Sequence, residues 1–135
     1  MPYNGKITTS IDPENLWKVH KFLQNVKIEN ADFATVLKNA KKDDFIFIDS
    51  PYAPLSSTSF DAYTNTGFNL DDHIRLANLF KQLDQKGCKI LLTNHNTPLI
   101  NELYKNYKIE VIPVKRMVNS VGSNRKGEEV TITNY

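Results

Sequence analysis

Continuous apolar runs and helix-like apolar spacings alternate along the chain. The runs occupy residues 45–48 (Phe-Ile-Phe-Ile), 89–93 and 107–114 and are typical of buried parallel strands. Helical spacing of apolar residues occurs at 12–23, at 33–40, from about 70 to 86 and at 97–104. Two short segments, 26–28 and 130–133, alternate as strands do. This order predicts an α/β fold with a mostly parallel sheet and an antiparallel last strand.

Capping residues mark several of the expected helix ends. Asp12 followed by Pro13 is a typical helix start, and Asn69 or Asp71 is expected to cap the long helix that Gly87 ends. The apolar side of that helix is predicted to consist of Ile74, Leu76, Ala77, Leu79, Phe80 and Leu83. His20 and His73 fall on expected helices and are interpreted as ordinary surface or boundary residues.

Three polar residues follow predicted strands directly: Asp32, Asp49 and Asn94. In sheets of this class, ligands bind beyond the carboxyl ends of the strands. We therefore expect these three residues on one rim of the sheet.

Asp49-Ser50-Pro51-Tyr52 has the chemistry to hold a flat group that carries an amine. The Asp49 carboxylate accepts one hydrogen bond and the main-chain carbonyl of Ser50 a second, while Pro51 fixes the backbone direction and Tyr52 offers a stacking face. The exocyclic amine of a flipped-out base fits this set. A strand that simply ends in a turn is the structural alternative.

Composition narrows the class only slightly. The 135 residues carry a net charge of +2, which neither demands nor excludes a polyanionic partner. A single cysteine, Cys88, cannot form an internal disulfide, the apolar runs are too short to cross a bilayer, and the first residues do not resemble a signal peptide. We expect a cytoplasmic protein. Three dispersed histidines and one cysteine give no metal-site spacing.

In order along nearly its whole length, the chain resembles the Dam-type (D12 class) DNA adenine-N6 methyltransferases, whose catalytic motif is Asp-Pro-Pro-Tyr. Asp32-Phe33 stands 17 positions (49 − 32) before Asp49, as an Asp-Phe pair does in that family. The other segments that carry the resemblance are 49–56, 58–60, 62–64, 67–68, 92–97, 120–127 and 133–135.

The resemblance implies a partial Rossmann-like methyltransferase sheet with helices on both faces. It also implies methyl transfer from S-adenosylmethionine, without a metal, to N6 of a flipped-out adenine in double-stranded DNA, within GATC. Asp49 and the Ser50 carbonyl then hold the amine beside the donor, and Tyr52 stacks on the base. Asp32 and the amide of Phe33 bind the adenine ring of the cofactor, and Asp49 is expected to contact the cofactor as well. The expected DNA-binding residues are Tyr63, Asn94, His95, Arg116, Asn124, Arg125 and Lys126.

Some of these assignments have structural alternatives. His95 is expected to shape the rim of the pocket more than to take part in the chemistry. The basic loop from Lys115 to Glu128 is either a solvated loop or a contact to DNA phosphates. Phe60, Tyr63 and Phe68 either pack a lid over the sheet or close on the flipped nucleotide.

The sequence departs from the family pattern in two ways. Ser50 replaces the first proline, but the expected role belongs to the main-chain carbonyl and survives. The family's Phe-x-Gly-x-Gly-like donor motif and its target-recognition segment have no counterpart, since the five glycines are dispersed. We therefore expect residues 1–135 to be one domain, the target-base half of a bacterial or phage enzyme, weak or inactive unless it self-associates or meets an N-terminal half.

Two other functions fit parts of the pattern. A catalytically dead fragment that binds DNA or a partner subunit fits the absent donor motif. A receiver-like phosphoacceptor domain fits Asp49 and Thr93 on neighbouring strands, but it lacks the acidic pair and the lysine that such domains need. Restriction–modification, mismatch marking and phage self-protection are equally compatible with the chain.

Overall fold

A computed structural model describes residues 12–55, 67–115 and 126–135. The chain divides into two compact units, Met1–Val36 and Leu37–Tyr135, and each is described by itself. The first unit holds a helix and its cap, and the second holds a sheet with its core.

Within the first unit, helix α1 (Pro13–Leu23) begins as expected. The side chain of Asp12 accepts a hydrogen bond from the amide of Asn15 (3.1 Å), and Pro13 occupies the first turn, where its missing N–H costs nothing. No residue of α1 is buried, and Leu16, Trp17 and Phe22 are exposed. Helix α1 is therefore a capped amphipathic helix whose apolar side is not covered by the described residues of its unit.

The strand expected at residues 26–28 does not form. The amide of Val26 instead bonds to the carbonyl of Leu23 and closes the turn that ends α1. Helix α2 (Phe33–Leu37) follows and is shorter than the predicted 33–40, and the side chain of Asp32 accepts a hydrogen bond from the amide of Ala34 (2.9 Å). Asp32 is thus a helix cap, not the end of a strand, because the short segment before it has no strand to pair with among the described residues.

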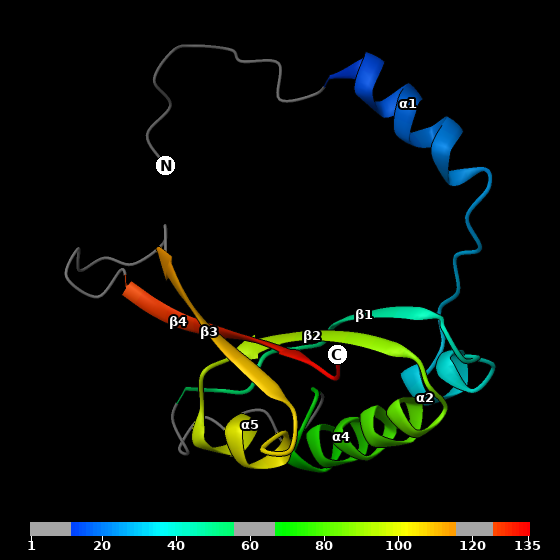
Figure 1. Cartoon of the computed structure of the whole chain (residues 1–135). Coiled ribbons are helices and arrows are strands. Elements are labelled where there is room, and N and C mark those ends of the chain that lie inside the picture. Colours follow the sequence, from blue (N-terminus) through cyan, green and yellow to red (C-terminus); the bar gives the residue numbers. More distant parts are fainter. Residues whose placement is uncertain (1–11, 56–66, 116–125) are drawn as a thin grey trace, which may run out of the picture. The chain divides into compact units, whose positions relative to one another are not determined.

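The second unit contains a four-stranded sheet in the order β1-β2-β4-β3 (Figure 1). Its strands are β1 (Phe45–Asp49), β2 (Lys89–His95), β3 (Lys108–Lys115) and β4 (Lys126–Thr133). Strands β1 and β2 pair in parallel, and β4 lies between β2 and β3, antiparallel to both. The antiparallel last strand is confirmed. The sheet was expected to be mostly parallel. Strands β1, β2 and β3 do run in the same direction, but β4 lies between β2 and β3, so two of the three pairings are antiparallel.

One face of this sheet carries the core. Ile46 and Ile48 of β1 point into the core with residues of α4 (Leu70–Gln85) and α5 (Pro98–Leu103), and both helices cover the same face in Figure 1. Phe45 and Phe47 lie on the other face and are 61% and 58% exposed. The run at 45–48 is therefore half-buried, and helices on both faces are not found among the described residues of the 37–135 unit. The buried core residues are Ile46, Ile48, Leu76, Phe80, Leu83, Ile90, Leu92, Ile100, Tyr104, Val130 and Ile132.

Helix α4 starts at a capping box. The side chain of Asn69 accepts a hydrogen bond from the amide of Asp72 (3.0 Å), and the Asp72 carboxylate accepts one from the amide of Asn69 (3.1 Å). Asn69, not Asp71, is therefore the cap. Gly87 ends the helix with φ 84°, a left-handed conformation that favours glycine. Ile74 is 40% exposed, contrary to the inward position expected for it.

His73 was expected at the surface or boundary, and this expectation is wrong. The side chain is only 2% exposed and packs edge-on against Phe68, with ring centroids 4.8 Å apart. Burial lowers the pKa of His73, and the nearby Asp72 carboxylate opposes that effect more weakly. Among the described residues, Nε2 of His73 has no hydrogen-bond partner.

No helix in the described parts of the chain combines the length and apolarity that a membrane span requires.

Candidate active site

The carboxyl ends of β1 and β2 lie side by side and bring Asp49 to the rim of the sheet. The parallel register pairs Asp49 with Thr93, and the Thr93 hydroxyl donates a hydrogen bond to Oδ1 of Asp49 (3.2 Å). Asp49 is exposed. A solvent-facing carboxylate, with one oxygen oriented by a neighbouring strand, is suited to accept a hydrogen bond from a ligand amine.

The segment after Asp49 is held from β2 by Asn94. The Asn94 side chain is only 1% exposed, and its Oδ1 accepts hydrogen bonds from the amides of Ala53 (2.8 Å) and His95 (2.9 Å). Its Nδ2 donates a long hydrogen bond to the Ser50 hydroxyl (3.5 Å). Asn94 was expected to bind DNA; in this structure its side chain bonds to the amides of Ala53 and His95 and to the Ser50 hydroxyl.

His95 holds the same loop from its other side. Nδ1 of His95 lies 2.8 Å from the carbonyl oxygen of Ala53. A carbonyl can only accept, so Nδ1 carries the proton in both the neutral and the charged ring. The imidazole also meets Tyr52 edge-on, with centroids 4.9 Å apart and the ring planes at 82°. The pocket-shaping role expected for His95 therefore has a concrete form, since the ring touches both the loop backbone and the predicted stacking residue.

The turn after β2 is bonded to the start of β4. The Asn96 side chain donates to the Glu128 carboxylate (2.7 Å) and accepts from Nδ2 of Asn101 (2.8 Å). Thr97 caps α5 by accepting from the amide of Ile100 (3.3 Å). These bonds join the turn after β2 to α5 and to the start of β4.

The other predicted site residues are distributed differently. Asp32, which is exposed, and Phe33 lie in the 1–36 unit. Lys126 begins β4, while Tyr63, Arg116, Asn124 and Arg125 lie outside the described residues. Asp49 and Thr93 were expected on neighbouring strands, but the hydrogen bond between their side chains was not predicted. The available signal was the place of Thr93 one residue before Asn94, on a strand predicted to lie parallel to β1.

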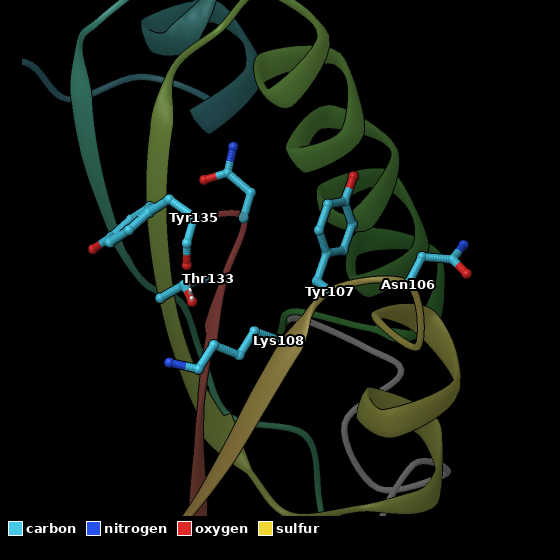
Figure 2. Close-up of a pocket in the computed structure, with 6 residues that line it drawn as sticks. Asn106, Tyr107, Lys108, Thr133 and Tyr135 are labelled. Carbon is cyan, nitrogen blue, oxygen red and sulfur yellow. Dashed lines mark hydrogen bonds between the residues drawn. The ribbon is translucent and has the colours of Figure 1, made fainter.

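A shallow pocket of about 330 Å³ lies at the opposite ends of the strands. Figure 2 shows Tyr107 and Lys108, at the start of β3, beside Thr133 and Tyr135, at the end of β4. Asn134 closes this region: its Nδ2 donates to the Asp84 carboxylate (2.7 Å), and its Oδ1 accepts from the amide of Ile90 (2.8 Å). This pocket lies where β2 and β3 begin, at the end of the sheet opposite to Asp49. Ligands of such sheets bind at the carboxyl ends of the strands, so the rim at Asp49 is the candidate site.

The fold and this rim define a class of protein. An open mixed α/β sheet places an Asp-Ser-Pro-Tyr loop at the end of a strand, and the chain matches the model of the D12 class N6 adenine-specific DNA methyltransferases over residues 2–119. The chain belongs to this family. The expected family is therefore confirmed, and the receiver-like phosphoacceptor alternative is wrong.

Individual relatives agree with the family. The chain is 41% identical over 129 residues to the type II methyltransferase M1.LlaDCHI of Lactococcus lactis, with 93% of this chain and 45% of that protein covered. It is 41% identical over 128 residues to the type II methyltransferase M.MjaIII of Methanocaldococcus jannaschii, with 92% and 44% covered. The DNA adenine methylase of Escherichia coli K12 is 32% identical over 113 residues, with 83% and 41% covered. The chain thus spans less than half the length of these relatives.

Proposed function

We propose that this chain supplies the target-base site of an S-adenosylmethionine-dependent DNA methyltransferase that modifies N6 of adenine. The observation that carries the proposal is the geometry of the rim. Asp49 ends β1 in solvent, oriented by Thr93, and the loop that follows is held by two residues of β2. A carboxylate at Asp49 and the main-chain carbonyl of Ser50 can together accept both hydrogens of an exocyclic amine.

The chemistry follows from what the amine needs. Its lone pair is delocalised into the purine ring, which makes the nitrogen a poor nucleophile. Acceptors at Asp49 and at the Ser50 carbonyl favour the pyramidal, charge-bearing geometry of the transition state over the planar ground state, and Tyr52 holds the base in place. The donor, when bound, supplies an electrophilic methyl group. This assigns roles to Asp49, Ser50, Pro51 and Tyr52.

For the donor, the proposal retains Asp32 and Phe33. Asp32 is exposed and caps α2 through Oδ1, and a carboxylate is the kind of group that accepts a hydrogen bond from an adenine amine. The amide of Phe33 lies in the first turn of α2, and a backbone amide can donate a hydrogen bond to a ring nitrogen of adenine. The chemistry of Asp32 and Phe33 therefore fits the adenine ring of S-adenosylmethionine.

Double-stranded DNA with a flipped-out adenine is the proposed substrate, and GATC is the proposed target sequence, by family resemblance. Lys126, Arg116, Asn124, Arg125 and Tyr63 are the proposed DNA contacts. For Asn94 and His95 the geometry favours holding the loop over touching DNA. The exposed Phe45 and Phe47 support the further proposal that the chain self-associates or meets an N-terminal half, which sedimentation of the purified chain tests.

The first experiment is calorimetric titration of the chain with S-adenosylmethionine and its demethylated product. We expect binding that Asp32→Ala removes and that Asp71→Ala, which changes another exposed acidic residue, leaves intact. A chain that binds neither ligand, alone or as an oligomer, is the outcome expected of a remnant that binds DNA or a partner subunit without catalysis.

The second experiment measures methyl transfer from labelled donor to a GATC duplex, with a GTAC duplex for comparison. Asp49→Ala is expected to lower the rate by at least about a hundredfold, because it removes an acceptor that acts in the transition state. Asp71→Ala is the matched control on α4. A rate unchanged by Asp49→Ala refutes the proposed site.

A further inference from the structure

We propose that Thr93, Asn94 and His95, called the 93–95 clamp below, are positioning residues that set the shape of the 49–53 loop. This inference rests on the proposed function, because it concerns the same site. It assigns the three residues that end β2 to the loop that follows β1. None of the three needs to touch the substrate.

The clamp bonds to both ends of the loop, at Asp49 and at Ala53. Thr93 donates to the Asp49 carboxylate (3.2 Å), Asn94 accepts from the amide of Ala53 (2.8 Å), and His95 donates to the carbonyl of Ala53 (2.8 Å). Both polar groups of the Ala53 backbone are therefore bonded to β2. The two peptide units that flank Ala53 are each held by one of these bonds, so neither rotates freely.

Burial makes the bond between Asn94 and Ala53 difficult to replace. Asn94 is 1% exposed and Ala53 is fully buried, so water cannot replace the bond between them. Its Oδ1 also accepts from the amide of His95, so one side-chain oxygen satisfies two backbone donors. An alanine at 94 leaves both donors without this acceptor, and the loop backbone is expected to move to find another.

His95 acts on the loop in two separable ways. Its Nδ1–H bonds to the Ala53 carbonyl, and its ring meets the Tyr52 ring edge-on. In the proposed site the Tyr52 ring stacks on the base, so its orientation matters for catalysis. The geometry assigns the larger effect to the Nδ1–H bond, because that bond fixes the backbone on which Tyr52 is carried.

The test compares four variants in the full chain. Asn94→Ala removes the buried acceptor, and Asn101→Ala is its control, since the Asn101 amide bonds to Asn96 and to the Thr97 carbonyl and not to the loop. His95→Asn keeps an N–H near the place of Nδ1 but loses the ring. His95→Phe keeps a ring but loses the N–H.

The first measurement is hydrogen exchange of the Ala53 amide by NMR. Asn94→Ala is expected to speed this exchange by about tenfold or more, because the amide loses its bond, while Asn101→Ala leaves it unchanged. The 15N shifts of His95 are expected to show a protonated Nδ1. An Ala53 amide that exchanges equally fast in wild type and Asn94→Ala overturns the clamp.

The second measurement is the methyl-transfer rate at saturating donor and DNA. Asn94→Ala and His95→Phe are expected to lower kcat by about a hundredfold, a typical result of displacing reacting groups by about an ångström. His95→Asn is expected to lower kcat by only about tenfold, and the KM for the donor should stay unchanged. Equal losses in Asn94→Ala and Asn101→Ala, or a greater loss in His95→Asn than in His95→Phe, overturn the inference.

The two proposals fail in different ways. If the wild-type chain transfers no methyl group to any DNA, whether alone, as an oligomer or together with an N-terminal half, the proposed function fails and the Ala53 exchange measurement alone decides the clamp. If the wild type is active and the clamp variants behave like Asn101→Ala, the function stands and the clamp is rejected.

Discussion

Replacement of His73 by leucine tests whether a buried imidazole makes the 37–135 unit sensitive to acid. The wild-type side chain is 2% exposed, and its Nε2 has no partner among the described residues. A buried polar atom left without a hydrogen bond costs about 1–3 kcal/mol. His73→Leu removes that cost, and some loss of packing against Phe68 offsets it, so we expect the free energy of unfolding to rise by about 1 kcal/mol near pH 8.

The effect of pH has a definite sign. Burial lowers the pKa of His73 in the folded chain below its ordinary value of 6.5. Below pH 6.5 the unfolded chain takes up a proton at this residue that the folded chain resists, so the free energy of unfolding falls with pH until the folded pKa is reached. The slope is at most about 1.4 kcal/mol per pH unit. The gain from His73→Leu is therefore expected to be larger at about pH 5.5 than at about pH 8.

The assay is urea unfolding followed by far-UV circular dichroism at both pH values. His20→Leu is the matched control, because His20 is exposed on α1 and keeps its contact with water when the chain folds. His20→Leu is expected to leave the free energy of unfolding nearly unchanged, because no residue of α1 is buried. Equal pH dependence in wild type and His73→Leu would refute the reasoning, as would a loss of stability in His73→Leu at both pH values.

Two further predictions concern stability. Asn134→Ala removes the side-chain bonds to Asp84, to the Cys88 carbonyl and to the amide of Ile90. It is expected to lower the free energy of unfolding by about 2–3 kcal/mol in urea titrations, and a loss below about 0.5 kcal/mol would contradict the prediction. Asn69→Ala breaks the capping box of α4 and is expected to lower the free energy of unfolding by about 1 kcal/mol in the same titrations. Asn69→Ser keeps a capping oxygen and should lose much less, so equal losses in the two variants would argue against the cap.

Much of the secondary structure was predictable because its signals are local. Asp12, Asn69 and Gly87 mark helix ends through their own side chains or backbone freedom, and each does so in the structure. The errors came where a pattern needs a partner. Residues 26–28 alternate like a strand but form none, and Phe45 and Phe47 belong to an apolar run yet lie on an uncovered face.

The candidate site was predictable in identity but not in its internal contacts. Asp49-Ser50-Pro51-Tyr52 is contiguous, so its chemistry could be recognised from the sequence. The roles of Asn94 and His95 were less visible, since each could equally face DNA or the loop. The bond between Asn94 and Ala53 joins residues 41 positions apart, and only the parallel register of β1 and β2 brings them together.

The sequence by itself determined the family, the alternation of helices and strands, and the residues that carry the chemistry, because these depend on residue types and short spacings. The tertiary structure decided the place of β4 between β2 and β3, the burial of His73, and the attachment of the 49–53 loop to the end of β2. These depend on which distant segments pair and in which register, and pairing is a property of the whole sheet that no single segment specifies.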